Sequence, residues 1–168
     1  MTIVQIVSGG QTGVDRAALD VAVALGLPCG GWVPRGRRAE DGRIPSSYPM
    51  RETASAGYPQ RTRFNVRDSD ATLILSRGAP SGGTALTINC AKALRRPCMV
   101  VDLDSVDATG ATDAVHAWLR RNGVRILNVA GPRESTAPGI AAEAGAFLRA
   151  LLADDPSVDT SPHPASEP

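Results

Sequence analysis

IVQIVSGGQTGVDRAALD, residues 3–20, joins an apolar run, a glycine-rich corner and an alanine-rich helical pattern in quick succession. A buried strand that passes through a tight corner into a helix is the repeating junction of α/β proteins. Amide groups at the start of such a helix have no intrahelical acceptor, so they can donate to phosphate or another oxyanion. The segment therefore predicts an α/β fold with an anion-binding corner.

This first corner carries several candidate binding groups. Its glycines permit positive φ angles and a close approach of the backbone to a ligand, and Arg16 adds a positive charge. The candidates are Gly9, Gly10, Gln11, Thr12, Gly13, Asp15 and Arg16. The pattern is neither G-x-G-x-x-G nor G-x-x-x-x-G-K-[ST], so it predicts neither dinucleotide binding nor nucleoside triphosphate hydrolysis. A tight strand-to-helix turn without a ligand is the alternative interpretation.

A second corner of the same kind follows the apolar run at residues 71–75. The sequence after it is SRGAPSGGTALTINCAKAL, and the candidates Ser81, Gly82, Gly83 and Thr84 stand directly before another helical pattern. Two such loops at the carboxyl ends of parallel strands line one crevice, which is the usual ligand position in open α/β sheets. We therefore expect the two corners to face each other.

Apolar runs and helical patterns alternate along most of the chain. The sequence predicts strands at residues 3–7, 29–33, 71–75, 98–101 and 125–129, and helices near residues 14–25, 83–94, 112–122 and 139–152. Continuous apolar strands that alternate with helices indicate a mostly parallel sheet covered on both faces, a Rossmann-like three-layer sandwich. We expect residues 1–153 to form one ligand-binding domain. Residues 154–168, rich in proline and serine, offer almost nothing to bury and predict a disordered tail.

Residues 34–70 interrupt this alternation, because they are too rich in arginine, proline and glycine for one regular element. Loops of this length inside a compact domain are functional or disordered, and the aromatic residues present favour an ordered binding segment. Arg35, Gly36 and Arg37 follow a predicted strand, so we expect them beside the first corner, where guanidinium groups match phosphate geometry. A solvated basic loop balanced by nearby acidic residues is the alternative.

Polar side chains further along complete the candidate set. Arg61 and Asn65 belong to a predicted helical turn, whose spacing places both on one side. A third corner, NVAGPRES at residues 128–135, is either a further binding corner or structural, because Pro132 fits a first helical position. Asp15 stands in the first turn of a helix, where the helix dipole favours a carboxylate without any function. We interpret it as a binding or structural residue rather than an acid–base catalyst.

The composition narrows the possible classes of function. Eighteen basic and seventeen acidic residues leave a formal net charge of +1, which argues against a general nucleic-acid or membrane-surface binder. No apolar run reaches the length of a transmembrane helix and no signal-peptide pattern is present, so we expect a cytoplasmic protein. Three cysteines without C-x-x-C spacing, and two histidines away from any nucleophile signature, predict neither a structural metal site nor a catalytic triad.

Five motifs together resemble a known family. They are SGGQTGVDRAALDVA (8–22), GGWVPRGRRAEDGRIP (30–45), YPQRTRFNV (58–66), SGGTALT (81–87) and NVAGPRES (128–135). They resemble the "putative molybdenum carrier" family, which is related to the molybdenum cofactor carrier protein of algae. The resemblance implies a Rossmann-like subunit of a homo-oligomer, a dimer or tetramer, that binds molybdenum cofactor (molybdopterin) or molybdate without chemistry. It also implies a molybdenum enzyme as the recipient partner.

The wider superfamily includes LOG-type phosphoribohydrolases, which cleave nucleoside monophosphates. Those enzymes resemble this chain at the second corner, but their motif P-G-G-x-G-T-x-x-E ends in a catalytic glutamate. Thr87 stands at the matching position here. A non-enzymatic carrier is therefore the leading hypothesis. The alternatives are a nucleotide-binding sensor and a nucleoside-phosphate hydrolase in which Asp15, Glu40 or Asp41 replaces the glutamate.

Overall fold

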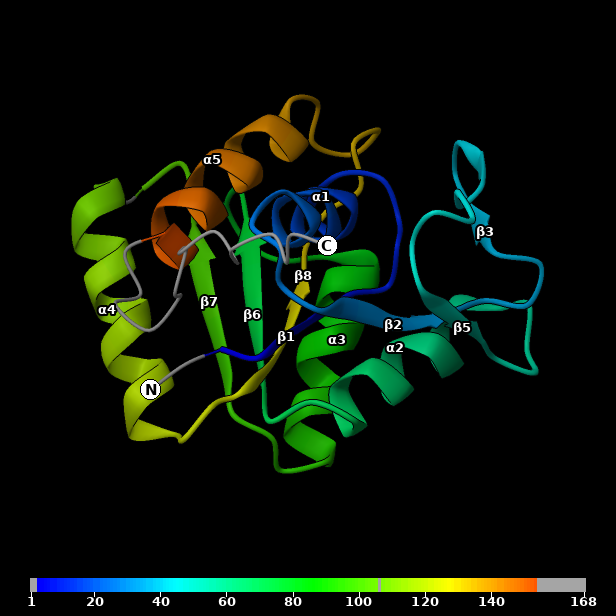
Figure 1. Cartoon of the computed structure of the whole chain (residues 1–168), viewed down its shortest axis with the longest axis horizontal. Helices are drawn as coiled ribbons and strands as arrows, with labels where there is room; N and C mark the ends of the chain where they lie inside the picture. Colours follow the sequence, from blue (N-terminus) through cyan, green and yellow to red (C-terminus); the bar gives the residue numbers. More distant parts are fainter. Residues whose placement is uncertain (1–2, 106, 154–168) are drawn as a thin grey trace, which may run out of the picture.

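A six-stranded parallel sheet forms the centre of the molecule (Figure 1). The computed structural model describes residues 3–105 and 107–153. The strands are β1 (Gln5–Val7), β2 (Cys29–Val33), β5 (Met50–Glu52), β6 (Ala71–Ser76), β7 (Cys98–Asp102) and β8 (Ile126–Ala130), in the order β5-β2-β1-β8-β6-β7. The chain builds outward from β1 to one edge, then from β6 to the other, and returns with β8 between them. The carboxyl ends of β1 and β6 thus flank a topological switch point, where open α/β sheets bind ligands.

Helices cover both faces of the sheet. In the described residues, α1 (Val14–Ala24), α4 (Ala108–Arg121) and α5 (Ile140–Ala153) pack on one face, with α2 (Tyr58–Arg67) and α3 (Gly82–Ala93) on the other. Each long helix predicted from the sequence is present, with its ends shifted by at most a few residues. The Rossmann-like α/β fold and its parallel sheet are confirmed.

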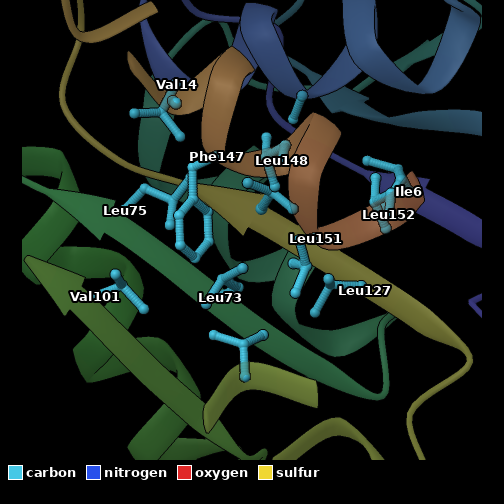
Figure 2. Packing of buried hydrophobic residues seen from close by; sticks show 14 of the residues in the cluster. Ile6, Val14, Leu73, Leu75, Val101, Leu127, Phe147, Leu148, Leu151 and Leu152 are labelled. Atoms are coloured by element: carbon cyan, nitrogen blue, oxygen red, sulfur yellow. The ribbon is translucent and has the colours of Figure 1, made fainter. Parts of the chain in front are cut away.

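The main core lies between the sheet and the face covered by α5. Figure 2 shows Phe147 and Leu151 of that helix directed toward Leu73 and Leu75 of β6 and Leu127 of β8. Every residue of β6 is buried, because this strand has neighbours on both sides and helices over both faces. Burying a leucine or phenylalanine side chain stabilises a fold by about 1.5–3 kcal/mol, so this layer fixes the sheet that carries the corners.

Residues 34–70 contain more regular structure than the sequence indicated. They form a two-stranded antiparallel hairpin of β3 (Arg38–Ala39) and β4 (Gly42–Arg43), then β5, then α2. The expected turn around Arg61 is a helix of ten residues, because Pro59 fits its first turn and three of its side chains are buried. The edge strand β5 was not predicted, since three mostly exposed residues show no apolar alternation.

Two further expectations concern the tail and membrane-spanning helices. The predicted tail, residues 154–168, lies outside the described residues. Among the helices of the described chain, none has both the length and the apolar character needed to cross a membrane.

Candidate functional site

The carboxyl ends of β1, β6 and β8 open into a cleft of about 580 Å³. Four segments line it, residues 9–15, 58–65, 76–87 and 128–137. The first and second corners therefore face each other as expected, and the third corner joins them. A cleft of this volume suits a small molecule of cofactor size.

The structure divides the sequence-predicted residues into two groups. Those that line the cleft are Gly9, Gln11, Asp15, Arg61, Asn65, Ser81, Gly82, Gly83 and Thr84. Those that do not line it are Gly10, Thr12, Gly13, Arg16, Arg35, Gly36 and Arg37. That the residues of either group bind a ligand stays a prediction. The cleft is also lined by Tyr58 and Arg133, which were not among the predicted binding residues. Arg133 lies in the third strand-to-helix corner, which was the feature of the sequence that could have identified it.

The N-terminus of α3 offers free hydrogen-bond donors to the cleft. Ser81 is the N-cap, and its side chain makes no capping hydrogen bond. The Ser81 carbonyl accepts the amides of Thr84 and Ala85, whereas the amides of Gly82 and Gly83 have no acceptor within residues 3–105 and 107–153. Both glycines are exposed, and the first turn of the helix carries no acidic residue. Unpaired amides and the positive end of the helix dipole together favour an anion at this position.

A buried ion pair forms the adjoining wall. The Arg61 guanidinium donates to the Gly9 carbonyl and lies 3.4 Å from Asp15 Oδ2, which also accepts the Gln11 amide at 3.3 Å. The two side chains are only 11% and 8% exposed. Burial raises the pKa of the Asp15 carboxyl above its ordinary value, and the Arg61 charge opposes that shift. Asp15 therefore neutralises much of the Arg61 charge within the protein.

A second arginine lies close to Arg61 on the same wall. The guanidinium carbons of Arg61 and Arg133 lie 5.3 and 5.6 Å from the centre of the Tyr58 ring. The aromatic ring favours both cations, and thereby helps to hold two like charges near each other. Arg133 is 37% exposed, and its nearest carboxylate oxygen, on Glu40, is 3.8 Å away. It is accordingly the less neutralised of the two charges that face the cleft.

The β3–β4 hairpin is fastened across the first and third corners. The hydroxyls of Thr12 and Ser135 donate to the Glu40 carboxylate, and the Glu40 amide donates to Gln11 Oε1 at 2.9 Å. Desolvation works to raise the pKa of Glu40, but the hydrogen bonds from Ser135 and Thr12 outweigh it and hold the pKa below its ordinary value. Thr12 thus anchors the hairpin, and its predicted contact with a ligand stays a prediction.

Arg16 likewise holds the hairpin. Its guanidinium lies 3.0 Å from Asp41 and donates to the Gly10 carbonyl at 3.1 Å. Arg16 lies beside the first corner, as expected, but its charge is paired with Asp41 of the hairpin. The sequence allowed Asp41 to pair with an arginine, but it did not identify Arg16 as the partner, because it does not reveal which loop returns to a corner.

Residues 6–152 match the family described as the circularly permutated YpsA SLOG family. The chain belongs to this family. Among solved structures, the "putative molybdenum carrier protein" of Syntrophus aciditrophicus SB is 44% identical and superposes with a TM-score of 0.89. The match covers 90% of this chain and 96% of that one. None of the curated proteins compared matches the chain. The family resemblance stated from the sequence is confirmed.

Arg37 of this SLOG chain has a structural role that the sequence prediction did not anticipate. Its buried guanidinium donates to the carbonyls of Ile44 at 3.0 Å, Pro45 at 2.7 Å and Tyr48 at 3.0 Å. A non-regular loop has carbonyls without ladder partners, and a five-donor guanidinium satisfies several at once. The neighbouring Arg35 is exposed and lies outside the cleft lining.

Thr87 and Asn65 line the SLOG cleft with their polar atoms already bonded. The Thr87 hydroxyl donates to the Gly83 carbonyl at 2.9 Å, one turn earlier in α3. The Asn65 amide pairs with the backbone of Trp32, accepting at 2.7 Å and donating at 3.0 Å, as a neighbouring strand does. In the described part of the chain, no group of three histidine, cysteine, aspartate or glutamate residues forms a metal-binding cluster.

Proposed function

We propose that this SLOG-family protein is a non-enzymatic carrier whose cleft holds a phosphorylated or oxyanionic ligand, namely molybdenum cofactor or molybdate. One observation carries the proposal. The unpaired amides of Gly82 and Gly83 and the side chains of two arginines line the same cleft. Amide donors and guanidinium groups are the partners that tetrahedral oxyanions prefer. The name of the related structure from Syntrophus aciditrophicus supports molybdenum as the element carried.

The chemistry of the cleft suits a molybdenum compound that keeps its own ligands. Molybdenum cofactor is a pterin dithiolene that bears a phosphate and an oxo-molybdenum centre. The phosphate or oxo groups accept hydrogen bonds from amides and arginines, so the protein needs no side chain on the metal itself. The described residues contain no cluster for direct metal ligation, which agrees with this mode of binding. We further propose a homo-oligomer that passes the ligand to a molybdenum enzyme.

One observation favours a second candidate, a hydrolase or sensor of nucleoside phosphates. Of the three carboxylates that could replace the missing glutamate, Asp15 lines the cleft, whereas Glu40 and Asp41 are bound to the hairpin anchors. Burial raises the pKa of Asp15, as in many acid–base catalysts. Release of free base from a panel of nucleoside monophosphates, absent in Asp15→Asn, supports hydrolysis; binding without release supports the sensor.

The carrier proposal is tested by anion titration under anaerobic conditions. Isothermal titration with molybdate compares the wild-type protein with Arg133→Ala, and Arg35→Ala is the matched control because Arg35 is exposed outside the cleft. We expect Arg133→Ala to weaken molybdate binding by about tenfold, the effect of losing one charge-assisted contact, and Arg35→Ala to leave it unchanged. Equal losses in both variants contradict the cleft as the site.

The cofactor itself is tested by native mass spectrometry. Protein purified without oxygen from a molybdenum-replete host should carry an adduct with the mass of molybdenum cofactor, and the same spectrum gives the number of subunits. A nucleotide adduct in its place supports the second candidate. A protein that binds neither molybdate nor cofactor refutes the carrier proposal.

A further inference from the structure

The cleft wall contains a buried hydrogen-bond donor without an acceptor. Gln11 is 5% exposed and lines the cleft, and its Nε2 is buried without a hydrogen-bond partner in the described chain. A buried donor left unpaired costs a protein about 1–3 kcal/mol, so such groups are rare unless a ligand completes them. Gln11 Nε2 therefore marks a place where an acceptor from outside the chain belongs.

The orientation of this amide is fixed by its own oxygen. Gln11 Oε1 accepts the Thr12 amide at 3.1 Å and the Glu40 amide at 2.9 Å. If the amide were turned over, an NH₂ group would face these two N–H donors and both hydrogen bonds would be lost. The free atom is consequently the nitrogen, and the free function is donation.

The same stretch of the cleft wall contains a free acceptor. The Gln11 backbone amide donates to Asp15 Oδ2 at 3.3 Å, so the Asp15 carboxylate lies against the Gln11 backbone. Oδ2 also takes Arg61, whereas Asp15 Oδ1 accepts no hydrogen bond from residues 3–105 or 107–153. Asp15 lines the cleft as well. This wall thus contains one donor and one acceptor that have no hydrogen-bond partner in the described residues.

We infer that Gln11 Nε2 and Asp15 Oδ1 recognise the edge of a 2-amino-4-oxopyrimidine ring, the ring shared by pterins and guanine. Its 4-oxo oxygen accepts from Gln11, and its ring N–H and 2-amino group donate to Asp15. The inference rests on the proposed function, because it assigns the second half of the same ligand. The Asp15 carboxylate disfavours an anion directly beside these two atoms, because the two negative charges would repel each other.

The cleft accordingly contains two kinds of recognition group. The α3 amides and Arg133 suit an oxyanion, and the pair formed by Gln11 and Asp15 suits an uncharged heterocycle. A site that hydrogen-bonds a polar edge rejects analogues that lack it more strongly than an apolar pocket rejects a change of size. Selectivity for the ring is therefore the property that this wall adds to anion binding.

The test compares ring analogues that differ at one atom. Wild-type protein is titrated with 6-hydroxymethylpterin and with 6-hydroxymethyl-lumazine, in which an oxygen replaces the 2-amino group and faces Asp15. We expect at least about a tenfold preference for the pterin, since the lumazine leaves a buried acceptor opposed by another acceptor. Guanosine and xanthosine monophosphates form the corresponding pair, and show whether the ring belongs to a pterin or to a nucleotide.

Two variants assign the preference to these residues. Asp15→Asn replaces the free acceptor with a donor, and Gln11→Glu keeps the oxygen that accepts Thr12 and Glu40 but removes the free donor. Each should abolish the amino preference or weaken pterin binding by about tenfold. Asp113→Asn, an exposed carboxylate on α4, is the control that should change nothing.

Titration with molybdate separates this inference from the proposed function. Melting curves first confirm that each variant is folded. Equal affinity for the amino and oxo compounds, or a preference that survives in Asp15→Asn, overturns the inference while molybdate binding leaves the carrier proposal standing. Failure of the wild-type protein to bind molybdate, pterin and guanosine monophosphate overturns both.

Discussion

Glu40 and Ser135 lie 95 positions apart in the chain, yet the Ser135 amide donates to the Glu40 carboxylate at 3.1 Å. The Ser135 hydroxyl donates to the same carboxylate, and so does Thr12 from the first corner. One side chain at the tip of the β3–β4 hairpin therefore joins two strand-to-helix corners that border the cleft. The hairpin holds the two corners together, although none of its own residues lines the cleft.

Replacing this carboxylate should destabilise the protein in a pH-dependent way. The hydrogen bonds lower the pKa of Glu40 below its ordinary value of 4.5, so the stability they supply is present above that value and is lost as pH falls through the folded pKa. We expect Glu40→Gln to lower the free energy of unfolding by about 1 kcal/mol at neutral pH. Urea denaturation should show that the difference from wild type shrinks below pH 4.5. A difference independent of pH contradicts this role.

The outcome for Arg37 shows what sequence reasoning captures and what it misses. A glycine corner after an apolar run predicted the junctions at β1 and β6 correctly, because that pattern is local and is fixed by the strand and helix on either side. The target of an arginine in a long loop depends instead on where the loop returns. Arg37 turned out to bond the carbonyls of its own loop, and Arg16 an aspartate of the hairpin.

The remaining residues of the site could not be predicted from the sequence for the same reason. Arg133 and Tyr58 come together only because β8 inserts between β1 and β6, and no local pattern encodes that strand order. The strand β5 was not predicted because it is short and mostly exposed, so its sequence lacks the alternation of a half-buried strand. Local junctions were thus predictable, whereas contacts between distant loops were not.

The structural role of Arg37 predicts a loss of stability. Arg37→Ala leaves one buried hydrogen bond and two partly buried ones unmade at the loop carbonyls, so we expect the free energy of unfolding to fall by about 1–3 kcal/mol. Arg35→Ala is the matched control, since Arg35 is exposed, and should change stability by less than about 0.5 kcal/mol. Chemical denaturation measures both. A stable Arg37→Ala protein with weakened molybdate binding would instead support the sequence-based prediction that Arg37 binds the ligand.

Gly13 should tolerate no side chain. Its φ is 78°, and a Cβ added there would collide with the carbonyl oxygen of Pro132 in the third corner. Gly26 has a similar φ of 68° but open space around it, which makes it a control for the backbone term alone. We expect Gly26→Ala to cost about 1 kcal/mol and Gly13→Ala clearly more, because the corners must separate. Thermal melting of the two variants decides the point, and equal losses would show that the close approach carries no energy.

A carboxylate placed at the uncapped N-terminus of α3 should raise the stability of the protein and lower its affinity for molybdate. At α4, the Asp107 side chain caps the helix and accepts the Gly110 amide at 3.0 Å, whereas Ser81 at α3 caps nothing. Ser81→Asp should place a carboxylate over the free amides and stabilise the protein by about 0.5–1 kcal/mol. The same carboxylate occupies the donors proposed for the oxyanion and repels its charge, so molybdate affinity should fall by at least about tenfold.

The neutral variant Ser81→Asn separates the two effects. Asparagine caps helices about as well as aspartate but adds no charge, so it should stabilise the protein while weakening molybdate binding less than Ser81→Asp does. Thermal melting gives the stability and isothermal titration the affinity for each variant. Greater stability with unchanged molybdate affinity in Ser81→Asp would show that the anion binds away from α3. Because destabilisation cannot explain a loss of binding in a stabilised protein, a gain in melting temperature together with a loss of affinity places the anion at this helix end.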